Sequence, residues 1–298
     1  MSLAVFGSVG LDDVETPAGS VQEVVGGSAV YFSLAASLFT GVRVAANVGG
    51  DFPESAWSVL RSRGADLSGL QVFSDRPTFR WSGRYEGDMN EAQTLKTELN
   101  VLAEAPVVPD SFGDARIVFL ANMGPDTQLS LIERFGDAVV FADTMNLWID
   151  TQRPALEKLL GLVYGFICND AEARALTGEQ NLIAAGQHLQ AMGPDIVVIK
   201  KGEHGSFLFT REGRFGLPAY PTDQVVDPTG AGDSFAGGFL GSLAEHDSWS
   251  LDELRRSMVY GTVCASLTVE SFSTSGLEQA GRMHLDKRFS ALRDFVSF

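Results

Sequence analysis

The chain has 298 residues, of which 45% are apolar and 20% charged, and its formal net charge is −16. This composition predicts a folded globular protein rather than a disordered chain. Because a polyanion is recognised through a basic surface, the acidic balance argues against nucleic acid or an anionic membrane as a partner. No apolar run approaches the roughly 18 residues of a membrane span, and Met1–Gly7 enters a strand pattern without a secretory signal. We therefore expect a cytoplasmic location.

Short apolar runs alternate with helical segments along most of the chain. Helices are expected at Ala29–Leu38 and Ser55–Arg63, among others. The expected strands are Leu3–Gly7, Val42–Val48, Ile117–Leu120, Val139–Phe141, Val163–Cys168 and Ile196–Ile199. Continuously apolar strands separated by helices are typical of a parallel sheet covered on both faces. The sequence therefore predicts one doubly wound α/β domain over residues 1–298.

Two segments, approximately residues 12–25 and 71–104, depart from this pattern and alternate between apolar and polar residues. In Thr78–Glu86 the residues Phe79, Trp81, Gly83 and Tyr85 alternate with Arg80, Ser82, Arg84 and Glu86. Such alternation predicts an antiparallel sheet with two unlike faces, which we interpret as a small lid. We expect Arg80 and Arg84 to face the substrate. The aromatic face would then pack on the main domain or, through the lid, on a second subunit of a homodimer. The reverse arrangement, with the aromatic side chains stacked on a nucleoside base, stays open.

The most informative segment is Asp227–Phe239, which begins Asp-Pro-Thr-Gly-Ala-Gly-Asp. Gly230, Ala231 and Gly232 form a small-residue turn, and the apolar stretch behind it predicts a buried helix. The start of a helix leaves amide N–H groups unpaired and carries partial positive charge, so it can hold an anion. The Asp233 carboxylate would repel a passively bound anion, but it suits a base that takes a proton from an attacking hydroxyl. Helix capping is the alternative role for Asp233.

This segment closely resembles the D-T-x-G-A-G-D-x-F signature of the ribokinase-like (phosphofructokinase B) carbohydrate and nucleoside kinases, with Pro228 where Thr is frequent. The resemblance implies that Asp233 is the catalytic base and that Gly230, Ala231 and Gly232 form an anion hole. It also implies a ribokinase-like fold and transfer of the γ-phosphoryl group of ATP, with Mg²⁺, to an alcohol. Asp227 matches a position that binds a monovalent cation in ribokinase-like members, which leaves activation by K⁺ open.

Near the N-terminus, Asp12 and the pair Gly26-Gly27 resemble the first signature of this family, where the Asp and the glycines contact substrate hydroxyls. A carboxylate suits that role because it can accept hydrogen bonds from two adjacent hydroxyls. Tyr31 stands where family members commonly carry Asn, which leaves the identity of the acceptor open. Asn122 follows the strand Ile117–Leu120, and ligands of open α/β sheets gather at the carboxyl ends of strands.

The nucleotide side of the site is expected farther along the chain. Asn169 and Glu172 match the family's N-x-x-E motif, which organises Mg²⁺ and phosphate, and oxygen ligands suit Mg²⁺. A helix cap followed by an acidic first turn is the alternative. Lys201, Gly202 and Gly205 resemble the Gly-x-x-Gly turn beside the nucleotide. Two cysteines are expected in the core and four histidines outside any metal site: Cys168, Cys264, His188, His204, His246 and His284.

We therefore expect an ATP- and Mg²⁺-dependent carbohydrate kinase. A nucleoside kinase of the same fold is the alternative, and the chain contains neither a P-loop motif nor a dinucleotide-binding motif after the first strand. The alternative outside enzymes is a catalytically silent regulator that binds a sugar or a nucleotide. Asp233 argues against that regulator, because a binding protein has no need of the base.

Overall fold

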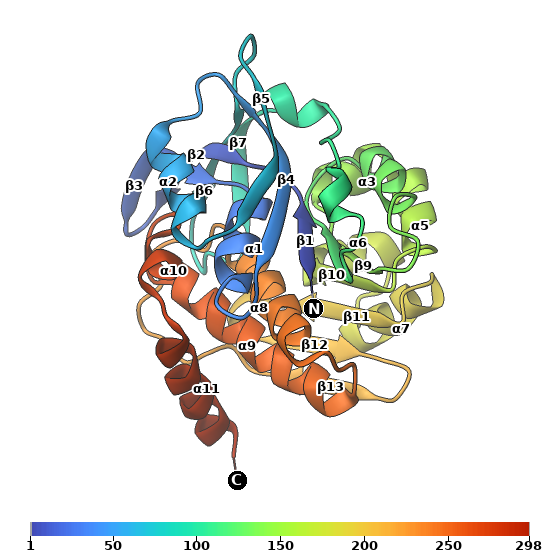
Figure 1. Ribbon diagram of the computed structural model, residues 1–298. Coiled ribbons are helices and arrows are strands. Elements are labelled where there is room, and N and C mark those ends of the chain that lie inside the picture. Colours follow the sequence, from blue (N-terminus) through green and yellow to red (C-terminus); the bar gives the residue numbers. More distant parts are fainter. Residues whose placement is uncertain (1, 298) are drawn as a thin grey trace.

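The computed structural model describes residues 2–297. Its larger sheet has nine strands in the order β13-β12-β11-β10-β9-β8-β1-β4-β5 (Figure 1). Neighbours from β11 to β5 are parallel, and β12 and β13 are added antiparallel at one edge. In that spatial order the strands span Arg214–Leu217, Ser206–Phe209, Ile196–Lys200, Gly165–Asn169, Val139–Ala142, Ile117–Leu120, Leu3–Phe6, Val42–Gly49 and Asp66–Phe73.

Helices cover both faces of this sheet (Figure 1). One hydrophobic core contains Leu3 and Val5 of β1 together with residues of α1, α2 and α8 to α11. The other contains Ala4 and Phe6 of the same strand with residues of α3 to α7. The central strands are therefore apolar at every position, because successive side chains enter opposite cores. The helices are α1 Ser28–Ala36, α2 Glu54–Ser62, α3 Pro125–Ile132, α4 Asn146–Thr151, α5 Arg153–Leu160, α6 Asp170–Thr177, α7 Leu182–Ala191, α8 Ala231–His246, α9 Leu251–Val269, α10 Ser275–Gln279 and α11 Arg282–Val296.

A separate sheet of four strands, in the order β3-β2-β6-β7, lies beside the main sheet. Its strands are β2 Gly10–Thr16, β3 Gly19–Gly26, β6 Phe79–Tyr85 and β7 Ala92–Glu98. The fold class is thus confirmed, a mostly parallel α/β sheet with a smaller second sheet. Two details of the prediction were wrong. Residues 71–73 belong to β5 of the main sheet, and β2 pairs with β6 in parallel although the other pairs are antiparallel.

Cys168 and Cys264 are buried and unpaired, in agreement with the expectation that both belong to the core. Within residues 2–297, no helix combines the length and the apolar composition that a membrane crossing requires.

Candidate active site

Acidic and basic side chains meet where the parallel strands β9, β10 and β11 end. Asp143 follows β9, Asn169 is the last residue of β10, and Lys200 is the last residue of β11, paired in register with Asn169. Asp233, in the first turn of α8, belongs to the same electrostatic cluster, because it influences the pKa of Asp143, Glu172 and, more remotely, Asp12. The structure therefore gathers residues from distant parts of the sequence at the edge where open α/β sheets bind ligands.

The start of α8 is shaped by Gly230, whose φ of 74° lies in the left-handed region that favours glycine. The ring of Tyr31 packs against Gly230, so a side chain at this position would collide with it. The amide of Ala231 donates to the carbonyl of Pro228 at 3.1 Å. Within residues 2–297, the amides of Gly232 and Asp233 have no backbone acceptor. The start of α8 thus offers an anion the amide of Gly232, since the Ala231 amide is bonded to Pro228 and the Asp233 amide interacts with the Asp233 carboxyl.

Asp233 is partly buried, and this burial raises the pKa of its carboxyl to about 6, against the lowering effect of the Lys200 ammonium. Asp233 therefore carries a negative charge at pH 7 and is a stronger base than an ordinary Asp. A group whose pKa lies near the working pH is suited to general base catalysis.

Asp12 is 4% exposed, and within residues 2–297 no donor forms a hydrogen bond to its carboxyl group. Burial, reinforced by the charges of Asp227, Asp233 and Asp13, raises its pKa to about 8. Gly26 has no side chain, which lets the carboxylate lie against its backbone, and a side chain on Gly27 would meet the backbone of Ser8. A buried carboxyl group without a hydrogen-bond partner is available to bond with a ligand.

Tyr31 and Asp227 border Asp12. Tyr31 is 2% exposed, and burial together with the neighbouring Asp12 raises the pKa of its phenol well above the ordinary value. Asp227 is buried, and it accepts from the amides of Thr229 at 2.9 Å and Ser273 at 3.3 Å. Asp227 thus ties two loops together beside the anion site.

The small sheet turns its aromatic face toward these residues. Asp12 pairs in parallel register with Trp81, which places both side chains on the same face. On that face the Trp81 ring covers Gly83, and the hydroxyl of Thr229 hydrogen bonds to the Tyr85 hydroxyl at 3.4 Å. The aromatic residues therefore line the side of the lid that faces Asp12 and the loop before α8.

Arg80 and Arg84 alternate with these aromatic residues along β6, and both form ion pairs, which argues against the expectation that they reach the substrate. Arg80 forms ion pairs with Glu23 at 2.7 Å and Asp51 at 3.0 Å, and Arg84 pairs with Glu15 at 2.7 Å. These ion pairs engage both guanidinium groups with acidic side chains.

Asn122 follows β8, as expected. Its side-chain oxygen accepts a hydrogen bond from the indole N–H of Trp148 at 2.8 Å. That contact occupies the oxygen of Asn122 and leaves its amide nitrogen for other partners.

Asn169 and Glu172 form a capping box at the start of α6. The Asn169 side chain accepts from the Glu172 amide, and the Glu172 carboxylate accepts from the Asn169 amide, both at 2.7 Å. The capping alternative is thus observed, yet the bond engages only one oxygen of Glu172. Burial raises the pKa of Glu172 to about 7, while Lys200 lowers it.

Lys201, Gly202 and Gly205 lie in the turn after β11. The Lys201 ammonium lies 3.8 Å from the centre of the Phe207 ring, and burial lowers its pKa. Gly202 and Gly205 both have positive φ, 53° and 82°. The tip of the lid reaches this turn, because the Asn90 side chain accepts from the Glu203 amide at 3.2 Å.

Sequence reasoning gave no role to two members of the cluster. They are Asp143 and Lys200. Asp143 is 6% exposed, one of its carboxylate oxygens is buried without a hydrogen bond, and burial raises its pKa well above the ordinary value. For Lys200, the available signal was its position as the last residue of a buried parallel strand.

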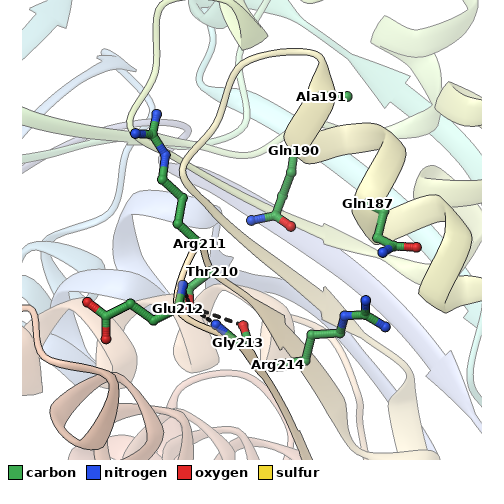
Figure 2. Close-up of a pocket in the computed structure, with 8 residues that line it drawn as sticks. All are labelled: Gln187, Gln190, Ala191, Thr210, Arg211, Glu212, Gly213 and Arg214. Atoms are coloured by element: carbon green, nitrogen blue, oxygen red, sulfur yellow. Dashed lines mark hydrogen bonds between the residues drawn. The ribbon is translucent and has the colours of Figure 1, made fainter.

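The described part of the chain contains no group of three or more His, Cys, Asp or Glu side chains arranged to hold a metal ion. A cavity of about 470 Å³ lies elsewhere, between α7 and the β12–β13 turn (Figure 2). This turn is at the opposite end of the sheet from Lys200, because β12 runs antiparallel to β11. The cavity is lined by Gln187, Gln190, Ala191, Thr210, Arg211, Glu212, Gly213 and Arg214, none of which belongs to the acidic cluster.

Comparison with known proteins identifies the family of this chain. Residues 4–280 match the model of the pfkB family carbohydrate kinases. The chain is 29% identical to cytidine kinase of Thermococcus kodakarensis, an alignment covering 80% of this chain and 87% of the relative.

Two solved structures share the fold. Ribokinase from Thermotoga maritima has a TM-score of 0.78 at 19% identity, with 97% of this chain and 99% of the other covered. Aminoimidazole riboside kinase from Salmonella enterica, complexed with aminoimidazole riboside and an ATP analogue, has a TM-score of 0.78 at 20% identity, with 97% and 100% covered. The chain belongs to the PfkB family of carbohydrate kinases.

Proposed function

We propose that this kinase transfers the γ-phosphoryl group of ATP to a hydroxyl of a nucleoside. The observation that carries the proposal is the juxtaposition of Asp233 with the open amide of Gly232 at the start of α8, in electrostatic contact with the buried carboxyl group of Asp12. A base, an anion site and an acceptor for substrate hydroxyls are the groups that phosphoryl transfer to an alcohol requires.

Asp233 takes the proton of the attacking hydroxyl. The amide of Gly232, at the positive end of α8, stabilises the charge on the phosphoryl group in transit. Gly230 shapes this turn, and Ala231 contributes to it through its bond to Pro228.

Asp12, Gly26 and Gly27 hold the sugar hydroxyls of the acceptor. Tyr31 borders the same space, and Asn122 is a further candidate contact through its amide nitrogen. Of the two candidate acceptors, a sugar and a nucleoside, we favour the nucleoside. The reason is that the aromatic side chains of Trp81 and Tyr85 lie on the same side of the lid as Asp12. Aromatic side chains stack on bases and contribute about 1–3 kcal/mol per base. The alignment with a cytidine kinase supports the same choice.

ATP is bound beside Asn169, Glu172, Lys201, Gly202 and Gly205. The donor set fits a hydrated Mg²⁺, because Glu172 has an oxygen outside the capping box and Asp143 has a buried oxygen without a partner. Mg²⁺ held there through water would neutralise phosphate charge. Asp227 is the candidate ligand for K⁺. A homodimer through the lid and a cytoplasmic location remain predictions.

A panel of nucleosides and sugars, screened for acceptor-dependent release of ADP, tests this proposal. We expect turnover with a nucleoside at a kcat/KM at least tenfold above that of any free sugar. Turnover with sugars alone would restore the carbohydrate acceptor. Nucleoside binding without ADP release would indicate the silent regulator instead.

A further inference from the structure

Lys200 lies against the first turn of α8. Its Nζ is 2.6 Å from the position that a Cβ on Gly232 would occupy. Gly232 therefore provides the space into which the ammonium extends, and a larger residue there would displace it. The lysine comes from β11 and the turn from α8, so the tertiary fold, not local sequence, brings the charge to the anion site.

Within residues 2–297, no acidic group lies within 4.0 Å of Lys200 Nζ, and no hydrogen bond of the ammonium is found. Its positive charge nevertheless acts on three carboxyl groups, since Lys200 lowers the pKa of Asp143, Glu172 and Asp233. A cation near several carboxylates but bonded to none keeps its donors free for an anion.

The surroundings explain why such a cation is needed. A phosphoryl group in transit is strongly negative, and the Asp233 carboxylate, which is charged at pH 7, would repel it. Amides at a helix start supply only partial positive charge. A full positive charge beside those amides offsets the repulsion in a partly dehydrated site, where charges interact more strongly than in water.

We propose that Lys200 is a further catalytic residue, whose ammonium contacts the phosphoryl group during its transfer. The inference rests on the proposed kinase function. As the acceptor oxygen bonds to the γ-phosphorus, the bond from that phosphorus to the bridging oxygen of ADP breaks, and the hydroxyl proton passes to Asp233. Lys200 keeps its own proton throughout and contributes charge and hydrogen bonds. A counterion that only keeps the carboxylates in place is the competing role.

Lys200→Met, which keeps the length of the side chain and removes the charge, separates these roles. We expect kcat to fall by about 10²–10³-fold, the usual effect of removing one group that stabilises the transition state. The KM of the acceptor should change less than threefold. Lys200→Arg should recover part of the lost rate, and Lys287→Met, an exposed lysine of α11, should match the wild type.

Binding of ADP with aluminium fluoride, a mimic of the transferring group, gives a second readout. In the presence of acceptor, the wild type should bind ADP more tightly with aluminium fluoride than without it. Lys200→Met should bind ADP alone with wild-type affinity but lose this gain in affinity from aluminium fluoride. A kcat within threefold of wild type, or a retained gain, overturns the proposal. If Lys200→Met does not fold, Lys200→Gln takes its place in both measurements. Absence of turnover by the wild type with every acceptor would instead refute the proposed function.

Discussion

Asp12 should destabilise the fold at alkaline pH. Its pKa of about 8 lies far above the ordinary value of 3.8, and burial is the main cause. Between these two pH values the folded protein keeps the proton on Asp12 and the unfolded chain has lost it. The folded state thus binds more protons, so the contribution of Asp12 to the free energy of unfolding falls as pH rises, and the fall is complete above the folded pKa.

The size of the effect follows from the shift. Each pH unit in this window changes the free energy of unfolding by about 1.4 kcal/mol, so the interval from pH 5 to pH 8 corresponds to about 4 kcal/mol. In Asp12→Asn the side chain has similar shape and no charge at either pH. Relative to the wild type, the free energy of unfolding of the variant should therefore rise by about 4 kcal/mol between pH 5 and pH 9. Its affinity for the acceptor should fall.

Urea denaturation of both proteins at pH 5 and pH 9 measures this gain. The control is Asp137→Asn, which removes an exposed carboxylate from a loop. It should change the free energy of unfolding by the same amount at both pH values. A stability difference between Asp12→Asn and wild type that is the same at pH 5 and pH 9 would refute the reasoning, because it would mean that Asp12 is ionised in the folded protein throughout this range.

Three further predictions concern the reaction. Glu172→Gln should raise the Mg²⁺ concentration for half-maximal rate by about tenfold, the usual scale for loss of an outer contact to a metal; an unchanged Mg²⁺ titration would leave Glu172 with capping alone. Trp81→Ala should raise the KM of a nucleoside acceptor by about tenfold or more through lost stacking, with the KM of ATP as internal reference. Arg84→Ala should leave both KM values unchanged, and the opposite pattern would restore the substrate-facing arginines. The kcat/KM of the wild type should fall tenfold per unit below about pH 6, because Asp233 must be unprotonated to accept the proton; a flat profile from pH 7 to pH 5 would contradict this.

The sequence predicted the main sheet well, because its signal is local. Strands such as Ile117–Leu120 are buried on both faces and are therefore apolar at every position. Asp233 was found for a similar reason, since the glycine turn and the helix it opens are contiguous. Both features depend on residues that are neighbours in the chain.

The orientation of the lid could not be predicted in this way. Alternation in Thr78–Glu86 shows that the strand has two faces, but not which of them meets the main domain. The parallel pairing of Asp12 with Trp81 decides this, and it joins segments far apart in sequence. Lys200 was missed for a related reason, because its relation to Gly232 exists only after β11 and α8 come together.

Turnover of Asp233→Asn on the best acceptor of the wild type tests the central claim most directly. Because burial already disfavours the charge of Asp233, the neutral variant should fold and melt at or above the wild-type temperature. Its kcat should fall by about 10²–10⁴-fold, the usual contribution of a positioned general base. Asp252→Asn, an exposed first-turn residue of α9, should keep wild-type turnover. A folded Asp233→Asn protein with near wild-type kcat would contradict the assignment of Asp233 as the base.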